Sequence, residues 1–150
     1  MIPTSATIAE SVIQVLELTL GFSATAVEDA CDLERVASLV AYVGISGPWQ
    51  GALTLEVPVS LARSAAAAMF LVEEDHAGRD EMSDALGELA NQLAGSLKGC
   101  IASGSQLSLP TVTEGGDYRV TVVGSSPVAE ARLESRGSRM RVVLHQRRAA

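Results

Sequence analysis

The chain has 150 residues, of which 47% are hydrophobic, 3% aromatic and 19% charged, and its formal net charge is −7. This composition excludes intrinsic disorder, and a chain of this length buries roughly 70% of its unfolded surface without disulfides or a structural metal. We therefore expect a single domain over residues 1–150. Apolar runs such as residues 65–72 are shorter than the roughly 20 residues of a membrane span. With no basic segment at Met1-Ile-Pro-Thr4, we expect a cytoplasmic protein without membrane insertion.

The charge distribution argues against nucleic acid as a partner. Residues 1–110 hold 14 acidic and 4 basic side chains, whereas residues 111–150 hold 4 acidic and 7 basic ones. The C-terminal arginines, however, alternate with apolar residues at strand spacing: Arg132, Arg136, Arg139 and Arg141. A solvated strand face explains this pattern better than a phosphate-binding patch, which needs clustered Lys and Arg.

Cysteine and histidine give no sign of a metal or redox site. Cys31 and Cys100 lack CxxC spacing, and His76 and His145 lie far apart in the sequence. Both cysteines are expected to be buried thiols, and neither a phosphate-binding glycine motif nor a nucleophile motif is present. We expect no cofactor and no metal in this chain.

The first 57 residues predict one helix and a strand pair. Thr7-Ile-Ala-Glu10 has the spacing of a capping box, and an apolar stripe follows to Leu20, where Gly21 ends the helix. Residues 23–30 alternate weakly and predict a short strand. Two β-rich segments, residues 35–45 and 49–57, flank a turn at Ser46-Gly-Pro48.

The remaining residues predict two more helices followed by strands. Pro58 suits the first turn of a helix that reaches residue 72, and Asp80 suits the N-cap of a long helix that reaches about residue 102. The predicted strands are residues 107–112, 118–123, 128–133 and 140–145, with turns at Gly115-Gly116, residues 125–127 and Gly137. Because helices and strands do not alternate, we predict an α+β fold with about three helices on a mainly antiparallel sheet.

The long helix has two distinct faces. At 100° per residue, one side is apolar, and the opposite side groups Asp84, Glu88, Asn91, Gly95 and Lys98. The apolar side comprises Met82, Leu86, Leu89, Leu93, Leu97 and Cys100, with Ala90 and Ile101 at its flank. A glycine in an exposed helix costs up to about 1 kcal/mol relative to alanine, so Gly95 suits close approach by another molecule. Any amphipathic helix has a polar face, and Gly87 and Gly95 also suit packing against the sheet; periodicity therefore assigns no function.

The residues themselves carry a family resemblance. Asp84-Ala-Leu-Gly-Glu88-Leu-Ala-Asn91-Gln-Leu-Ala-Gly95, followed by Leu107-Ser-Leu-Pro110-Thr-Val, resembles the D/S-xxx-E-xx-N signature and downstream proline of the CheC/CheX/FliY chemotaxis phosphatases. Val43-Gly-Ile-Ser-Gly47, ahead of the strand that begins at Gly51, is similar to the segment that precedes the site in CheX. The similarity covers about two thirds of the chain.

The resemblance implies a CheX-like protein phosphatase that hydrolyses the aspartyl phosphate of a CheY-like receiver domain. Asn91 would position the attacking water, Glu88 would contact the receiver's active-site lysine, and Asp84, Gly95 and Pro110 would support them. Mg²⁺ would be bound by the phosphorylated receiver. Two other readings stay open, namely a CheX-like module that binds a receiver or another signalling protein without hydrolysis, and a structural piece of a flagellar switch.

Two departures from the family bear on these expectations. Eighteen residues separate Asn91 from Pro110, a few fewer than is usual, and Gly99 falls late in the helix; both favour an early helix end. CheC-type members carry a second Glu and Asn on their first helix, whereas here Glu10 is followed by Ile13, so one site is expected. CheX-like proteins resemble homodimers joined through their sheets, with which the apolar strands are compatible.

Overall fold

The computed structural model describes residues 2–28, 36–101, 103–115 and 122–149. Three α-helices, one 3-10 turn and seven strands occur in these residues, which confirms the predicted α+β class. In chain order they are α1 (Ser5–Leu20), β1 (Thr25–Ala26), β2 (Ser38–Ser46), β3 (Gly51–Pro58), α2 (Val59–Phe70), η2 (Glu74–His76), α3 (Arg79–Ile101), β4 (Gln106–Leu107), β5 (Thr111–Gly115), β6 (Ser125–Ser135) and β7 (Ser138–Arg147).

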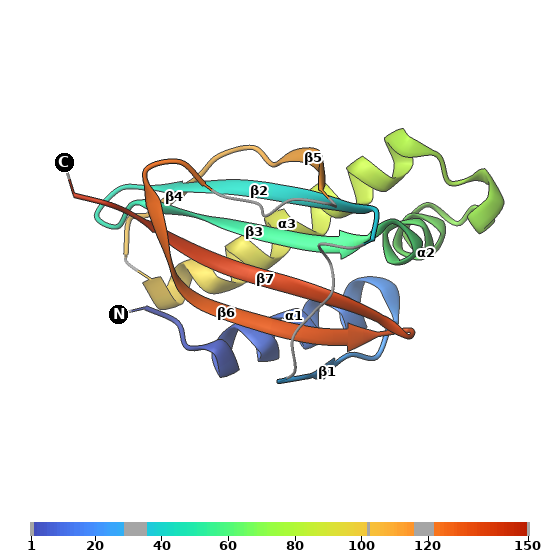
Figure 1. The fold of residues 1–150 in the computed structure, drawn as a ribbon, viewed down its shortest axis with the longest axis horizontal. Coiled ribbons are helices and arrows are strands. Elements are labelled where there is room, and N and C mark those ends of the chain that lie inside the picture. The colour runs from blue at the N-terminus through green and yellow to red at the C-terminus, as the bar shows by residue number, and fades with distance from the viewer. Residues whose placement is uncertain (1, 29–35, 102, 116–121, 150) are drawn as a thin grey trace.

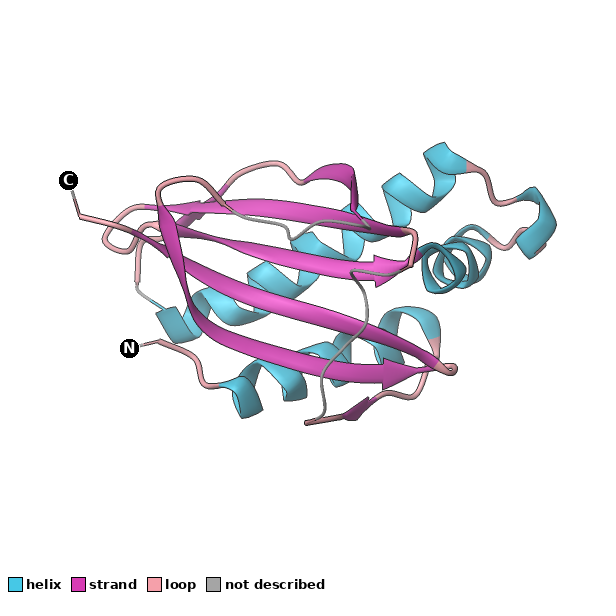
Figure 2. Cartoon of the chain, viewed as in Figure 1, coloured by secondary structure: helices cyan, strands magenta, loops and turns pink. Residues whose placement is uncertain are grey.

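The strands form one sheet, and every strand pairing among the described residues is antiparallel. The order is β1-β6-β7-β3-β2, and the outer edge of β2 pairs with β4 near one end and with β5 near the other. Helices α1 and α3 lie on one side of this sheet, with α3 running behind β2 and β3 and α1 behind β6 and β7, while α2 lies beyond the end of β3 (Figures 1 and 2). The fold therefore has two layers.

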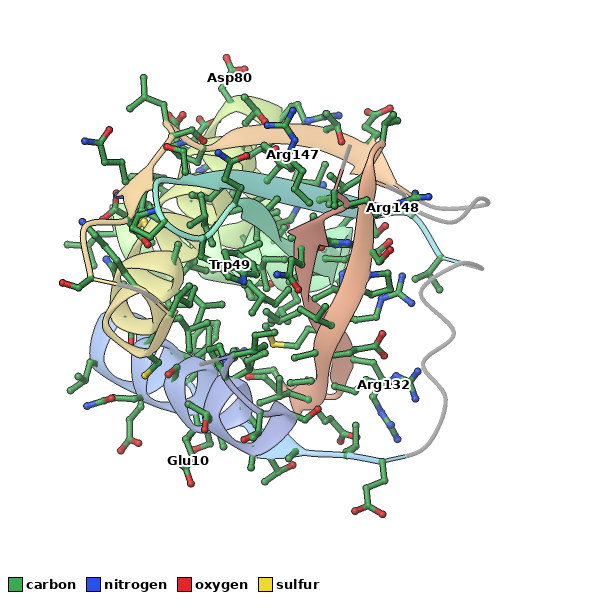
Figure 3. All side chains as sticks on the ribbon, turned by 90° about the vertical axis from the view of Figure 1, so that its left-hand side faces the viewer. Glu10, Trp49, Asp80, Arg132, Arg147 and Arg148 are labelled. Atoms are coloured by element: carbon green, nitrogen blue, oxygen red, sulfur yellow. The ribbon has the colours of Figure 1, made fainter. Side chains whose placement is uncertain are left out.

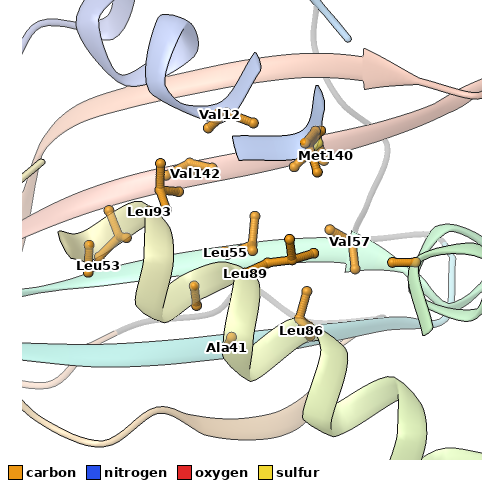
Figure 4. Close-up of a cluster of buried hydrophobic side chains, with 14 of the residues drawn as sticks. Val12, Ala41, Leu53, Leu55, Val57, Leu86, Leu89, Leu93, Met140 and Val142 are labelled. Atoms are coloured by element: carbon orange, nitrogen blue, oxygen red, sulfur yellow. The ribbon is translucent and has the colours of Figure 1, made fainter. Parts of the chain in front are cut away.

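The core lies between these layers (Figure 4). Alternate residues of each central strand face the helices, as the two-residue period of a strand requires. Leu53, Leu55 and Val57 of β3 pack there against Leu86, Leu89 and Leu93 of α3. Small side chains of α3 are buried beside them, namely Ala85, Ala90 and Ala94. Much of the alanine in this chain thus serves close packing between layers, because few large side chains keep them apart.

The first helix begins earlier than predicted. Thr4, rather than Thr7, is the N-cap, and its hydroxyl accepts a hydrogen bond from the Thr7 amide. The sequence has a cap residue at both positions, and the helix extends one turn back to the earlier one. The predicted end is confirmed, since Gly21 adopts a left-handed conformation with φ of 73° after Leu20.

The starts of the other two helices also differ by one or two residues. Pro58 ends β3 in an extended conformation and caps α2, so the first helical residue is Val59. Asp80 does not occupy the N-cap but lies inside the first turn of α3, where its negative charge interacts favourably with the helix dipole. At the other end α3 continues through Gly99 to Ile101 and does not end early. Cys100 is exposed, which corrects its predicted burial; Cys31 lies outside the described residues.

The strand predictions in the last third of the chain were less accurate. The predicted strand 107–112 is divided between β4 and β5 by a break at residues 108–110. Residues 118–121 of the predicted strand 118–123 lie outside the described residues, and residues 122–123 are not in a strand. Residues 125–127, predicted as a turn, are the start of β6, with a bulge between Pro127 and Ala129. The turn at Gly137 is confirmed: Arg136 and Gly137 both have positive φ, as a two-residue hairpin turn requires.

Several arginines of β6 and β7 lie on the sheet face away from the helices, among them Arg132, which is labelled in Figure 3. Three of these arginines form ion pairs, Arg132 with Glu130, Arg139 with Glu134 and Arg141 with Glu56, while Arg136 stacks over the Phe22 ring. These arginines therefore bind groups of the protein itself, as expected for a strand face and not for a phosphate-binding patch. Within the described parts of the chain, no helix combines the length and apolar character that crossing a membrane requires.

Candidate functional site

The candidate site is the exposed stripe of α3. Asp84, Glu88, Asn91 and Gly95 are all exposed, while the helix buries its opposite face against the sheet. Their spacing of four, three and four residues places them along one side of the helix. The structure thus confirms that these predicted residues share one solvent-facing stripe.

On one flank of this stripe α3 contacts α1. The Thr19 hydroxyl of α1 donates to Oε1 of Gln92 at 2.6 Å, and Nε2 of Gln92 donates to Oε1 of Glu88 at 3.0 Å. One turn further along α3, the Ser96 hydroxyl donates to the Ser11 hydroxyl of α1 at 3.4 Å. The Glu88 carboxylate is therefore connected to α1 through one intervening side chain.

On the other flank lies Pro110. A Cβ built on Gly87 would meet the Pro110 ring at 3.5 Å and Val112 at 3.8 Å, which are ordinary van der Waals distances, so this segment packs directly against α3 at Gly87. Pro110, separated from the motif in sequence, thereby borders the stripe.

Ser108 holds the Pro110 segment in place. Its amide donates to the carbonyl of Gly44 at 2.9 Å, and its hydroxyl accepts from the Gly44 amide at 2.8 Å. The side chain thus continues the β2 edge across the break between β4 and β5. A Cβ on Gly44 would lie 3.3 Å from the Ser108 hydroxyl, so this approach favours glycine there.

The functional groups of the stripe are free to meet a partner. Among the described residues, no hydrogen bond or ion pair engages the side chains of Asp84 or Asn91, and Glu88 uses only Oε1. Asp80 and Glu81 in the first turn make the surroundings acidic, and Lys98 lies in the last turn. A carboxylate and a carboxamide on one exposed helix face can bind a cation and orient a water molecule.

Potential metal ligands do not cluster here. In residues 2–28, 36–101, 103–115 and 122–149 there is no group of three or more His, Cys, Asp or Glu side chains that suits a metal ion.

A cleft of about 510 Å³ lies on the other side of the sheet, lined in part by Thr54, Glu56, Arg141 and His145. Burial, and then the nearby Arg141 charge, lower the pKa of His145. None of the motif residues of α3 lines this cleft.

Sequence reasoning missed Gln92 and Thr19. Gln92 follows Glu88 by four residues, which is a spacing at which helical side chains contact each other, so this hydrogen bond had a sequence signal. Thr19 lies 73 residues before Gln92, and only the packing of α1 beside α3 brings the two together.

Comparison with known proteins agrees with the motif. The family model described as "Chemotaxis phosphatase CheX" matches residues 39–133. No curated protein matches the sequence.

Solved structures share the fold. The chain is similar to the chemotaxis protein CheX from Vibrio vulnificus, with 17% identity, a TM-score of 0.76 and 91% of each chain covered. It is also similar to a chain of the CheX-CheY-BeF3-Mg²⁺ complex from Borrelia burgdorferi, with 17% identity, a TM-score of 0.68 and coverage of 99% of this chain and 100% of that one. FliY from Thermotoga maritima has 17% identity and a TM-score of 0.61, with coverage of 91% of this chain and 83% of its own. The family model spans more than half of the chain, and the protein therefore belongs to the CheX chemotaxis phosphatase family.

Proposed function

We propose that this protein binds the phosphorylated receiver domain of a CheY-like response regulator and accelerates hydrolysis of its aspartyl phosphate. The observation that carries this proposal is the exposed Asn91 carboxamide, which has no partner among the described residues and lies one helical turn from Glu88, in a chain of the CheX family. The Borrelia burgdorferi structure, in which a protein of the same fold forms a complex with CheY, BeF3 and Mg²⁺, supports the choice of partner.

Asn91 is the proposed catalytic residue. Its carboxamide has one acceptor and one donor end, so it holds a water molecule through the oxygen while the N–H group faces a phosphoryl oxygen. Water attacks phosphorus in line, the bond from phosphorus to the aspartyl oxygen breaks, and inorganic phosphate and a free aspartate result. Phosphoryl transfer needs positioning and charge neutralisation more than covalent participation by the protein, which an asparagine can provide.

Glu88 is the proposed docking residue. Its exposed carboxylate suits an ion pair with a lysine of the receiver, which fixes the depth at which Asn91 reaches the phosphoryl group. Asp84 adds negative charge on the same face, Gly95 leaves room for the receiver's surface, and Pro110 borders the stripe from the opposite flank. Mg²⁺ is expected to reside in the receiver, where it neutralises charge on the acyl phosphate.

The direct test measures phosphate release from receivers loaded with acetyl phosphate. Adding this protein should shorten the lifetime of the phosphorylated receiver, and Asn91→Ala should remove about 10²-fold or more of that acceleration, as loss of a positioning group does. Gln14→Ala, which removes another exposed helical amide, serves as the matched control. Asn91→Ala should leave the fold intact because alanine is the better helix former.

Asn91 is also the only asparagine in the chain, which gives a direct physical readout. Selective ¹⁵N-asparagine labelling should give one side-chain amide pair in the NMR spectrum, and a receiver treated with beryllofluoride should shift it. An unchanged lifetime with all cognate receivers would contradict hydrolysis. Shifted Asn91 resonances with an unchanged lifetime would instead favour the non-catalytic binding module.

Two other expectations from the sequence remain predictions. A cytoplasmic location is tested by fractionating the source cells, and a homodimer joined through the sheet is tested by sedimentation at several protein concentrations. A single species with the mass of one chain at all concentrations would contradict the dimer.

A further inference from the structure

The hydrogen bonds that run from α1 to Glu88 point to a function for two residues outside the motif. We infer that Thr19 and Gln92 are positioning residues that hold the Glu88 carboxylate in the conformation that docks the receiver. This inference rests on the proposed function, because it concerns the residue proposed to contact the receiver's lysine. It assigns α1, which lacks a motif of its own, a part in the site of α3.

The polarity of these bonds is consistent from end to end. An ionised carboxylate only accepts hydrogen bonds, so the NH₂ end of the Gln92 amide must face Glu88. Its oxygen then faces α1, where the Thr19 hydroxyl donates to it at 2.6 Å. The two bonds therefore determine one orientation of the amide, and each strengthens the polarisation of the other.

The arrangement leaves half of the carboxylate for the partner. Gln92 engages Oε1 of Glu88, whereas Oε2 has no hydrogen-bond partner among the described residues. A glutamate on an exposed helix otherwise samples several rotamers, and binding must restrict them. Holding one oxygen in advance lowers this entropic cost and directs the other oxygen outward, which is the general benefit of preorganisation.

The α1 end of the connection is firmly placed. Thr19 lies in the last turn of α1, between the buried Leu16 and the left-handed Gly21, and Phe22 is buried directly beyond. Thr19 and Gln92 are themselves partly buried. Core packing of α1 therefore fixes the hydroxyl that orients Gln92.

A purely structural role is the competing explanation, since the same bond also ties α1 to α3. The chain offers a matched control for it: Ser96 and Ser11 tie the same two helices one turn away without touching Glu88. Loss of the Ser96–Ser11 contact should affect only the packing of α1 against α3, whereas loss of the Thr19–Gln92 bond should also weaken receiver binding.

The experiment compares four variants of the full chain: Gln92→Met, Thr19→Val, Thr19→Ser and Ser96→Ala. The dissociation constant is measured with a beryllofluoride-treated receiver, and KM and kcat with the phosphorylated one. Gln92→Met and Thr19→Val should raise the dissociation constant and KM about threefold to tenfold, with a smaller fall in kcat, because Asn91 itself is untouched. Thr19→Ser keeps the hydroxyl and should stay near wild type, as should Ser96→Ala. Circular dichroism checks that every variant is folded.

A double-mutant cycle separates action through Glu88 from direct contact. In a Glu88→Ala background, Gln92→Met should have no further effect on binding, because the carboxylate that it orients is gone. An equal further loss would overturn the inference, and so would equal dissociation constants for Gln92→Met and Ser96→Ala.

Failure of the proposed function gives a different result. A receiver that binds but is not dephosphorylated would overturn the phosphatase proposal, while the ratio of dissociation constants would still decide the inference. Absence of any receiver binding to the wild-type protein would overturn both.

Discussion

Polar residues on the two sides of this molecule are arranged in opposite ways. On the sheet face away from the helices, Glu56 is buried, accepts a hydrogen bond from Ser38 at 3.0 Å and pairs with Arg141 at 2.7 Å. Beside it, the Thr54 hydroxyl lies 3.1 Å from Nε2 of the buried His145. On α3, by contrast, Asp84 and Asn91 are exposed and have no partner among the described residues.

The difference separates groups that stabilise the fold from groups that are available for binding. A buried charge must be paired, because leaving it unpaired costs several kcal/mol, and such a pair has little to offer a partner. An exposed amide or carboxylate contributes little to stability, and its polar atoms remain available to bind another molecule. The predictions below test whether stability and activity divide between the two faces in this way.

The largest effect is expected for the buried pair. Glu56→Ala removes a side chain that is only 4% exposed and leaves Arg141, 14% exposed, without its counter-charge. We expect a loss of about 3–5 kcal/mol in the free energy of unfolding, measured in urea, because one partner of a buried pair remains. Receiver dephosphorylation by the folded fraction should be unchanged. A loss below about 0.5 kcal/mol would contradict the division, because that is the range of ordinary surface changes.

The second prediction concerns pH. Burial, followed by the Arg141 charge, lowers the pKa of His145 below its usual 6.5, and the neighbouring Glu56, Glu130 and Arg148 line the same cleft. The unfolded chain therefore binds more protons than the folded one between that lowered pKa and about pH 6.5. The contribution of His145 to the free energy of unfolding should be fully present above pH 6.5. Below pH 6.5 the free energy of unfolding should fall with decreasing pH, by at most about 1.4 kcal/mol per pH unit.

Urea unfolding at several values between pH 7.5 and 5.5 measures this slope. His145→Gln should flatten it, because the group that titrates is removed. An equal slope in the wild type and the variant would assign the pH dependence to another residue.

The third prediction sets stability against function at one position. No atom lies within 4 Å of a Cβ built on Gly95, so Gly95→Ala should stabilise α3 by about 0.5–1 kcal/mol. The added methyl group lies on the motif stripe and should weaken receiver binding. Gly99→Ala is the matched control, since Gly99 is equally open and lies one turn later. It should bring the same stabilisation with unchanged binding, and equal binding by both variants would argue against contact at Gly95.

The smallest effect is expected for Asp84→Asn. The exposed side chain has no partner among the described residues, so the free energy of unfolding should change by less than about 0.5 kcal/mol. If Asp84 adds to the attraction of a basic receiver site, the association rate should fall modestly at low salt and approach the wild-type rate at high salt. An effect that is independent of salt would point to a direct contact instead.

Local sequence signals predicted the helices and the motif stripe well. Gly21 ended α1 as predicted, because a left-handed residue at that position needs no side chain. The 3.6-residue period placed Asp84, Glu88, Asn91 and Gly95 on one exposed face, since burial of the opposite apolar face is the dominant constraint on a helix. The same period wrongly buried Cys100, which is exposed near the end of α3.

Strand boundaries depended on partners that are distant in the sequence. Residues 107–112 read as one strand, but at Ser108 the side-chain hydroxyl, in place of a main-chain carbonyl, accepts from the Gly44 amide, and the main-chain pairing is divided between β4 and β5. Residues 125–127 carry turn-forming residue types, yet pairing with β7 holds them in β6. In both cases the neighbouring strand decides, since a turn propensity is weak compared with a row of main-chain hydrogen bonds.

The sequence by itself therefore determined the α+β class, the long amphipathic α3 and the motif that identifies the family, because these depend on residues within a few helical turns or strand positions of one another. Only the tertiary structure decided what surrounds the motif: Pro110 against Gly87 on one flank, and Thr19 bonded to Gln92 on the other. These contacts join residues far apart in the chain, and their geometry follows from how α1 and β5 pack against α3. Packing between distant segments leaves no local periodicity or spacing in the sequence from which these contacts could be predicted.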